Sequence, residues 1–221
     1  MTELYVANTD CLKNKELFDA CYAMLPSFRK EKVDRLQSIE KKVLSMGAFL
    51  LLVDALRKRG ISPEEIEFSY NANGKPTLTH FPNVHFSVSH SGNTVFCAVS
   101  DAAVGCDVER IRRIDLNIIS RFFSPREQAQ IEAQPTQADK EKMFFRLWTL
   151  KESFIKMTGQ TLSQLKDFSV IIQEDGTRLD PNKNFYLQEF SLGDNYCYAC
   201  CSEVPDISPP VTINLEDIKR P

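Results

Sequence analysis

The chain has 221 residues and a mass of 25.2 kDa, with 27 basic against 30 acidic residues and a formal net charge of −3. Hydrophobic residues make up 43% and charged residues 26%, which is typical of a globular protein that folds without disulfides or a structural metal. The slight negative charge argues against a general nucleic-acid binder. The start of the chain lacks the pattern of a secretory signal, and its apolar runs are too short to span a bilayer. We therefore expect a cytoplasmic protein that binds neither nucleic acid nor membrane, with its seven cysteines reduced.

The first hundred residues predict a strand, then helices, then more strands. Residues 3–7 predict a strand, and helical spacing follows over 12–25. A stretch from Arg29 to Lys42 holds six basic and three acidic residues, and a solvated helix face is its ordinary explanation. Residues 38–59 predict a long helix, and 73–76 a turn. Alternation predicts strands over 85–90, 94–100 and 104–109, which we expect to form a meander.

The second half of the chain repeats this order of elements. We expect helices over 116–122, from Ser124 onward and over 139–158, then strands over 168–173, 184–191 and 195–202. The tail from Pro205 is rich in proline and is expected to be peripheral. This order predicts an α+β fold with two similar halves, residues 1–101 and 102–204, followed by a tail of residues 205–221.

Charged side chains on two predicted elements are candidates for chemistry. Asp107 and Glu109 alternate along one strand, so both side chains lie on one face. Glu152 and Lys156 are four residues apart on one helix, next to Lys151. Three carboxylates with open positions suit Mg²⁺, which typically shares its coordination with substrate phosphates. The alternatives are an exposed strand end and an ordinary surface ion pair.

Two further patterns have competing explanations. Ser89 and His90 are neighbours on a strand and point to opposite faces, which disfavours a hydrolase with a serine nucleophile. His90 is either a donor to a phosphate or a structural histidine. A C-x-x-C-C cluster at Cys197, Cys200 and Cys201 allows zinc or redox chemistry, but buried thiols in a strand are favoured.

Four segments together resemble the motifs of 4′-phosphopantetheinyl transferases of the surfactin type. They are F-S-V-S-H-S-G at 86–92, V-G-C-D-V-E at 104–109, R-F-F-S at 121–124 and L-W-T-L-K-E-S-F-I-K at 147–156. The resemblance covers about residues 3–202. It implies two similar α/β halves related by a pseudo-twofold axis, with coenzyme A in the cleft between them. It also implies transfer of 4′-phosphopantetheine from coenzyme A to a serine hydroxyl of an apo acyl or peptidyl carrier protein, with release of adenosine 3′,5′-bisphosphate.

The resemblance assigns roles to particular residues. Asp107, Glu109 and Glu152 match the Mg²⁺ ligands, Glu152 also matches the base for the serine hydroxyl, and Lys156 matches a lysine near the reacting phosphate. Expected contacts of coenzyme A are Arg29, Lys32, Lys42 and His90 at the 3′-phosphate, Lys75 and Pro76 beside the adenine, Ser89 beside the phosphates, and Lys151 as a further cation that holds either the helix or the phosphates. Lys42 is one residue away from the aligned place, which Val43 occupies. A monomer is expected, because one chain supplies both halves.

A carrier surface and two other functions complete the expectations. Arg110, Arg112 and Arg113, with apolar residues up to Phe122, offer a surface complementary to an acidic carrier protein, and a solvated loop is the alternative. A binding module would hold coenzyme A or a carrier without turnover, but it would not need the carboxylate triple. A metal-dependent phosphodiester or pyrophosphate hydrolase would share the carboxylates and release free phosphopantetheine without a carrier.

Overall fold

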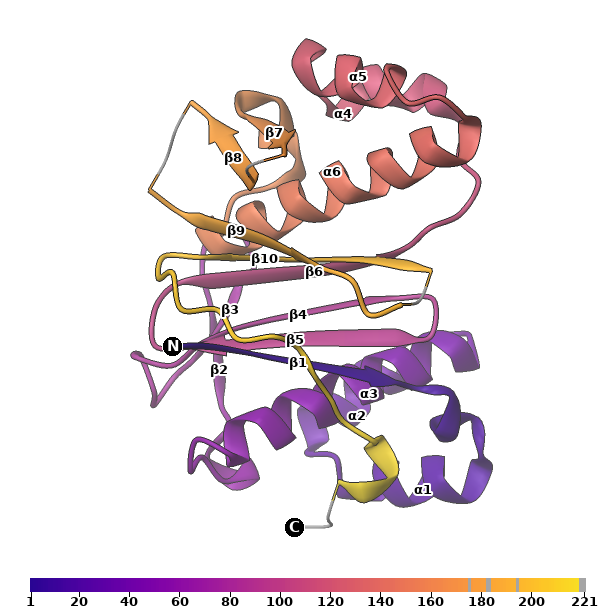
Figure 1. The fold of residues 1–221 in the computed structure, drawn as a ribbon. Coiled ribbons are helices and arrows are strands. Elements are labelled where there is room, and N and C mark those ends of the chain that lie inside the picture. The colour runs from indigo at the N-terminus through magenta and orange to yellow at the C-terminus, as the bar shows by residue number, and fades with distance from the viewer. Residues whose placement is uncertain (175, 182–183, 194, 219–221) are drawn as a thin grey trace.

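The computed structural model describes residues 1–174, 176–181, 184–193 and 195–218, and it has an α+β fold. Two sheets stack face to face in the middle of the molecule, and one long helix covers the outer face of each sheet (Figure 1). The predicted fold class is therefore confirmed. The arrangement is consistent with two similar halves, whereas the pseudo-twofold axis remains a prediction.

The first sheet is built mainly from the N-terminal half. Its strands are β1 (Thr2–Asn8), β5 (Thr94–Ser100), β4 (His85–Ser91) and the short β11 (Val211–Thr212), in the order β11-β1-β5-β4. The strands pair antiparallel except β11, which runs parallel to β1. Helix α3 (Ile39–Arg57) packs on the outer face through buried side chains such as Leu51 and Leu56. The other elements of this half are α1 (Lys15–Met24), α2 (Ser27–Asp34), β2 (Phe68–Tyr70) and β3 (Pro76–Leu78).

The second sheet is antiparallel and belongs to the C-terminal half. Its order is β6 (Val104–Arg110), β10 (Tyr196–Ser202) and β9 (Tyr186–Phe190). Helix α6 (Gln137–Thr158) covers it and ends at Gly159, whose left-handed φ of 68° suits glycine. The shorter elements are α4 (Ile119–Phe122), α5 (Pro125–Glu132), β7 (Ser169–Gln173) and β8 (Gly176–Asp180). Helix α5 begins with a capping box between Ser124 and Glu127.

The expected meander of three strands is wrong in one respect. Strands β4 and β5 form a hairpin, but β6 leaves this sheet and starts the second one. The turn at 101–103 carries the chain across, so that β6 lies beside the edge strand β4 without joining its backbone ladder. Alternation predicts each strand but says nothing of its partner, because pairing depends on contacts distant in the sequence.

An apolar layer lies between the two sheets. Phe96 from β5 and Tyr198 from β10 meet edge to face, with ring centroids 5.5 Å apart. The other buried members are Leu4, Val6, Ala98, Val104, Cys106, Val108 and Cys200. Burying a large side chain of this kind contributes roughly 1.5–3 kcal/mol, so this layer is a main source of cohesion between the halves.

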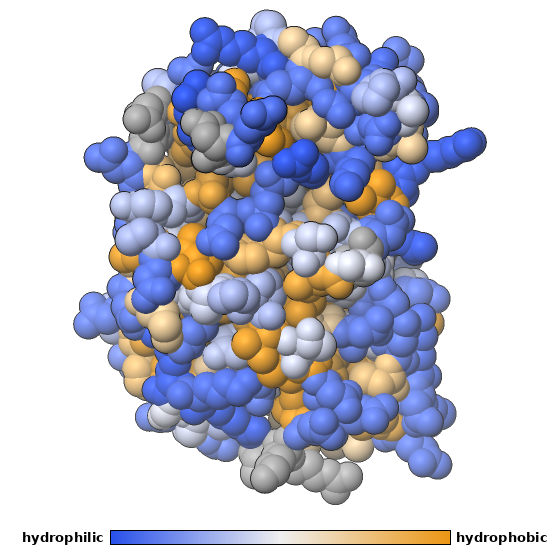
Figure 2. All heavy atoms as spheres, viewed as in Figure 1, coloured by the Kyte–Doolittle hydropathy of each residue, from blue (hydrophilic) through white to orange (hydrophobic). Residues whose placement is uncertain are grey.

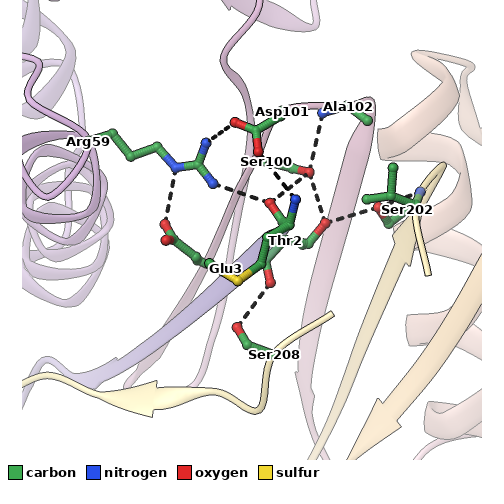
Figure 3. Close-up of polar contacts among 10 residues, drawn as sticks. Thr2, Glu3, Arg59, Ser100, Asp101, Ala102, Ser202 and Ser208 are labelled. Atoms are coloured by element: carbon green, nitrogen blue, oxygen red, sulfur yellow. Dashed lines mark hydrogen bonds and ion pairs between the residues drawn. The ribbon is translucent and has the colours of Figure 1, made fainter. Parts of the chain in front are cut away.

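Buried hydroxyls close one end of this layer. Thr2 Oγ1 lies 2.8 Å from Ser100 Oγ and 3.0 Å from Ser202 Oγ, which joins strands of both sheets (Figure 3). Nearby, the guanidinium of Arg59 donates to Glu3, to Asp101 and to the carbonyl oxygen of residue 1 (Figure 3). The halves are thus joined by polar contacts at the edge as well as by apolar packing.

The tail from Pro205 is more integrated than expected. Strand β11 extends the first sheet, and the amide of Thr2 donates to the Asp206 carbonyl. Leu215 is buried in the core beneath α3. The sequence does not reveal this packing. The proline content argues against a strand, and a two-residue edge strand with one buried leucine leaves little periodic signal.

All seven cysteines are free, and six of them are buried. Cys197 and Cys201 face α6, whereas Cys200 faces the layer between the sheets. Burial raises the pKa of the Cys197 and Cys201 thiols to about 12, so these side chains stay protonated at neutral pH. The interpretation of the C-x-x-C-C cluster as buried strand thiols is confirmed.

Length and apolar content decide whether a helix can span a membrane. None of the helices in the described part of the chain is long and apolar enough to cross a bilayer. On the face shown in Figure 2, most of the surface is hydrophilic, and hydrophobic side chains show through in separate areas.

Gly105 brings the second sheet unusually close to its helix. A Cβ at this position would collide with the carbonyl oxygen of Ser153 and the amide nitrogen of Met157, both in the backbone of α6. Glycine is needed here for space rather than for an unusual φ, since its φ is not positive. The contact places Lys156 on α6 over the strand that carries Asp107, and so it fixes the geometry of the site.

We expect Gly105→Ala to lower the free energy of unfolding by about 3 kcal/mol, because backbone atoms on both sides must move. Urea unfolding followed by circular dichroism measures this loss. Gly47→Ala on α3 is the matched control, since its Cβ would meet side-chain atoms, the nearest being Thr9 Cγ2, rather than backbone. A loss at residue 105 no larger than at residue 47 would contradict the close-approach explanation.

Candidate active site between the two halves

A pocket of about 830 Å³ opens between the N-terminal and C-terminal halves. The N-terminal half lines it with parts of α2, α3, β4 and the 70–76 hairpin, and the C-terminal half with α6 and residues 159–163. Seven of the predicted site residues line this pocket: Arg29, Lys32, Lys75, Pro76, His90, Glu152 and Lys156. The structure thus brings together side chains that are up to 127 residues apart, Arg29 and Lys156 being the extremes.

The 71–75 turn ties the two halves together at the pocket wall. Lys75 Nζ donates to the carbonyl oxygen of Met157 at 2.8 Å, and Asn73 Nδ2 donates to that of Gly159 at 2.8 Å. Both acceptors lie at the C-terminal end of α6, where backbone carbonyls lack helical partners. Burial lowers the pKa of Lys75. This side chain therefore both lines the pocket and fixes its width.

Arg29 and Lys32 form a cationic end of the pocket. They lie three residues apart on α2, on one side of the helix. Arg29 Nη2 donates to the carbonyl oxygen of Ser45 at 2.7 Å, and its guanidinium lies 4.7 Å from the ring centroid of Phe49. Its Nε is buried and has no hydrogen-bond partner in the described part of the chain. A buried donor without a partner is costly, so this end favours an anionic ligand.

The pKa values of this end are lowered by burial and by repulsion between its cations. Burial lowers the pKa of Arg29, and burial followed by the charge of Arg29 lowers that of Lys32. Desolvation and then the charge of Lys156 lower the pKa of His90. Neither Arg29 nor Lys32 pairs with a carboxylate among residues 1–174, 176–181, 184–193 and 195–218. An anion placed here would offset the repulsion between these cations.

Asp107 and Glu109 lie side by side on β6, as predicted from their spacing. Ser89 donates to Asp107 Oδ1 at 2.6 Å, and Ser91 donates to Glu109 Oε2 at 2.7 Å. Lys156 reaches the same place from α6, and its Nζ donates to Asp107 Oδ1 at 2.6 Å and to Ser89 Oγ at 2.9 Å. The side chains of β4, β6 and α6 therefore converge next to the pocket. Lys156 lines the pocket, whereas the two carboxylates of β6 and the serines that contact them lie beside it.

Carboxylates outnumber the cations that contact them at this acidic end. Burial raises the pKa of Glu152 to about 7, and the charges of Asp107 and Glu109 raise it against the opposing effect of Lys156. Burial and then the charge of Asp107 likewise raise the pKa of Glu109. In the described part of the chain, Lys156 pairs with Asp107 and the exposed Arg112 pairs with Glu109, so two cations face three carboxylates that repel one another.

The carboxylates fit a divalent cation that completes its coordination elsewhere. Within the described part of the chain, no group of three or more His, Cys, Asp or Glu side chains is close enough to hold a metal by itself. However, Asp107 Oδ2 is buried without a hydrogen-bond partner among the described residues, while Oδ1 is engaged by Ser89 and Lys156. Mg²⁺ usually binds one or two carboxylates together with waters and substrate phosphates, so an open site of this kind suits it.

Lys42 and Lys151 lie away from the pocket, whereas Ser89 lies beside it in contact with Asp107 and Lys156. Lys42 is half-buried on α3 and does not line the pocket. Lys151 is fully buried, and its Nζ donates to Glu127 Oε1 at 2.6 Å and to the Phe168 carbonyl oxygen at 2.8 Å. Consecutive helical residues differ in direction by about 100°, so Lys151 faces α5 and β7 while Glu152 faces the pocket. Of the two roles considered for Lys151, the structure supports holding the helix.

Sequence reasoning missed several residues that line the pocket or lie beside it. Ser91 and Asn73 hold the walls together, and Phe49 stacks on Arg29. Residues 160–163, which follow the end of α6, form part of the far wall. A serine at every second position of β4, Ser87, Ser89 and Ser91, was the available signal for the contact with β6, since such residues share one face of a strand.

Comparisons with known proteins show the family to which this chain belongs. A model of the 4′-phosphopantetheinyl transferase superfamily matches residues 103–201. A 4′-phosphopantetheinyl transferase of Bacillus pumilus is 42% identical over 155 residues, which cover 68% of this chain and 66% of the relative. The 4′-phosphopantetheinyl transferase Sfp of Bacillus subtilis strain 168 is 34% identical over 173 residues, covering 76% and 77%. A second Bacillus subtilis 4′-phosphopantetheinyl transferase is 31% identical over 194 residues, covering 85% and 86%.

Among solved structures, the holo-[acyl-carrier-protein] synthase of Thermotoga maritima matches with a TM-score of 0.38 and 17% identity, over 46% of this chain and 62% of that one. The sequence relatives establish the family independently of this match. The chain belongs to the 4′-phosphopantetheinyl transferase family of enzymes.

Proposed function

We propose that this enzyme transfers the 4′-phosphopantetheine group of coenzyme A to a serine hydroxyl of an apo acyl or peptidyl carrier protein and releases adenosine 3′,5′-bisphosphate. The observation that carries the proposal is one pocket lined by Arg29 and Lys32 from α2 and by Glu152 and Lys156 from α6, with Asp107 in contact with Lys156. Coenzyme A has a 3′-phosphate and a pyrophosphate, so one elongated anion would satisfy both ends. The apolar wall between them, which includes Phe49 and Phe86, suits the adenosine.

The proposed chemistry follows from the acidic end. Glu152 has a pKa of about 7 and can accept the proton of the serine hydroxyl near neutral pH. The serine oxygen forms a bond to the phosphorus next to the pantetheine, and the bond from that phosphorus to the bridging oxygen breaks. Lys156, which lines the pocket, holds the reacting phosphate. Asp107, Glu109 and Glu152 would hold Mg²⁺, which when bound supplies positive charge against the charge that develops in the transition state.

The carrier is proposed to approach over the basic segment after β6. Arg110, Arg112 and Arg113 are exposed there, and Arg112 also pairs with Glu109 and lies over the ring of Phe145. Phe122 is half-buried against Trp148, with ring centroids 5.1 Å apart, so only part of it is available to a partner. An acidic carrier would complement this charge. One chain forms the whole pocket, which supports action as a monomer. A cytoplasmic location is part of the same proposal.

Intact-protein mass spectrometry of apo carrier proteins, incubated with the enzyme, coenzyme A and Mg²⁺, tests the proposal. We expect a mass gain of one phosphopantetheine that a chelator prevents. Binding of coenzyme A without any mass gain across several carriers would instead favour a binding module. Free phosphopantetheine formed without a carrier would favour a hydrolase.

The cationic end yields a specific prediction. We expect the double variant Arg29→Ala/Lys32→Ala to raise the KM for coenzyme A by about 100-fold, because each charged hydrogen bond to a phosphate contributes about 1.5–3 kcal/mol. The KM for dephospho-coenzyme A, which lacks the 3′-phosphate, should change little.

Lys30→Ala/Lys41→Ala is the matched control, since it removes two positive charges from the same stretch without touching the pocket wall. Lys30 donates to the Ala23 carbonyl oxygen instead. Steady-state kinetics with both substrates measures these effects. Equal increases in KM for the two substrates would contradict binding of the 3′-phosphate at this end of the pocket.

A further inference from the structure

Strands β4 and β6 are joined by serine hydroxyls in place of a backbone ladder. The two strands are edges of different sheets and lie next to each other. Ser87 Oγ accepts from the amide of Cys106 at 3.0 Å, and Ser91 Oγ accepts from that of Arg110 at 3.1 Å. Ser89, between them, donates to Asp107 Oδ1. These three side chains set the register between the halves along the edge where the carboxylates lie.

Ser91 makes two contacts that differ in kind. Its hydroxyl donates to Glu109 Oε2 at 2.7 Å while accepting from the Arg110 amide at 3.1 Å. A hydroxyl can donate and accept at once, so this one group fixes both the Glu109 carboxylate and the backbone that follows it. Arg112 contacts the same carboxylate oxygen, Oε2, from the exposed side at 3.3 Å.

We propose that Ser91 is a positioning residue, which orients the Glu109 carboxylate toward the divalent cation by holding it and the end of β6 against β4. The proposal rests on the proposed function, because it concerns the cation of that site. Ser91 is half-buried, whereas Arg112 is exposed and its contact is longer. The serine is therefore the better-defined restraint. Without it, Glu109 would retain only a solvent-exposed partner, and its side chain would occupy several rotamers.

The contact is suited to an effect on cation binding. Residues that hydrogen-bond to metal ligands orient them, and their loss typically weakens metal binding or activity about 10–100-fold. Ser89 cannot substitute for Ser91, because its hydroxyl is already engaged with Asp107 and Lys156. Threonine at position 91 retains a hydroxyl and is favoured in strands, so it is the conservative replacement.

Mn²⁺ binding to the full-length enzyme tests the proposal without turnover. Mn²⁺ prefers the same oxygen ligands as Mg²⁺, and its free form is quantified by electron paramagnetic resonance, with coenzyme A present and carrier absent. We expect Ser91→Ala to raise the Kd for Mn²⁺ about tenfold or more, and Ser91→Thr to restore most of the affinity. Glu109→Ala should weaken binding at least as much, and Ser91→Ala combined with Glu109→Ala should bind no worse than Glu109→Ala alone.

Ser202→Ala is the matched control. It removes a buried hydroxyl that also joins the two sheets, through Thr2, at the far end of β10 (Figure 3). We expect it to lower the midpoint of thermal unfolding without changing the Kd for Mn²⁺. A similar change in Kd for Ser202→Ala and Ser91→Ala would show that any weakened contact between the two sheets impairs Mn²⁺ binding. That result would overturn the positioning role of Ser91.

The outcomes separate the proposal from the function on which it rests. Normal Mn²⁺ affinity in Ser91→Ala, with weakened binding in Glu109→Ala, overturns the role of Ser91 and leaves the cation site intact. Unchanged affinity in Glu109→Ala overturns the assignment of the cation ligands and the positioning role with it. Transfer to a carrier, measured separately by mass spectrometry, then decides whether the reaction itself stands.

Discussion

Replacement of Asp107 by Ala is expected to lower the rate of phosphopantetheine transfer by about 10³-fold or more, the upper range for removing one preorganised stabilising group. The change removes the buried Oδ2, which has no partner among the described residues and is the best-defined candidate cation ligand. It also leaves Lys156 without its closest carboxylate. Single-turnover transfer to a carrier, with product mass as the readout, measures the effect.

Two comparisons separate chemistry from folding for this prediction. Asp107→Asn keeps the shape of the side chain and the contact with Ser89, but removes the negative charge. Asp19→Ala removes an exposed carboxylate that pairs only with Lys15 in the described contacts, and it should leave transfer unchanged. Full activity in Asp107→Ala would exclude this carboxylate from the reaction.

Replacement of Lys151 by Ala is expected to lower the free energy of unfolding by about 3–5 kcal/mol, because it leaves the Glu127 charge buried and unpaired. Both side chains are completely inaccessible to solvent. Glu127 Oε1 also accepts from the amide of Val170, and Oε2 from that of Ser124, so one carboxylate joins α5, α6 and the start of β7. Lys151 Nζ lies 4.3 Å from the ring centroid of Phe168, which adds a cation–π contact.

A double-mutant cycle in urea unfolding measures this pair. Lys151→Met/Glu127→Gln removes both charges while retaining side-chain volume and hydrogen-bonding atoms at position 127. We expect it to be more stable than Lys151→Met alone, because no buried charge remains. Additive losses would show that the two charges are not coupled. If the Lys151 variant loses more transfer activity than folded protein, Lys151 would again be a candidate contact of the phosphates.

Strong periodicity made the main elements predictable. The expected helices over 38–59 and 139–158 correspond to α3 and α6, and the expected strand over 94–100 is β5. Weak elements were missed, such as β8, whose polar residues G-T-R-L-D lack an alternating apolar pattern. Helix α2 was seen only as a basic stretch, since its short amphipathic face buries only Val33 completely.

The candidate site was predictable where a short motif holds its members together. Period two placed Asp107 and Glu109 on one face, and helical spacing related Glu152 to Lys156. Adjacency in the sequence was misleading for Lys151. It is the neighbour of Glu152 in the chain, but its side chain is buried against α5, where it pairs with Glu127. Roles implied by the family resemblance, such as cation binding, remain predictions for the measurements described here.

The sequence by itself determined the α+β class and the principal strands and helices, because these depend on local periodicity. Its motifs also carry the family resemblance that assigns the candidate site residues. Only the tertiary structure decided that β6 leaves the first sheet, that Gly105 lets α6 approach it, and that Ser89 and Ser91 connect the two halves. It also decided that Arg29 and Lys156 line one pocket. These features arise from packing between segments distant in the chain, where space and unpaired polar groups, rather than local pattern, select the arrangement.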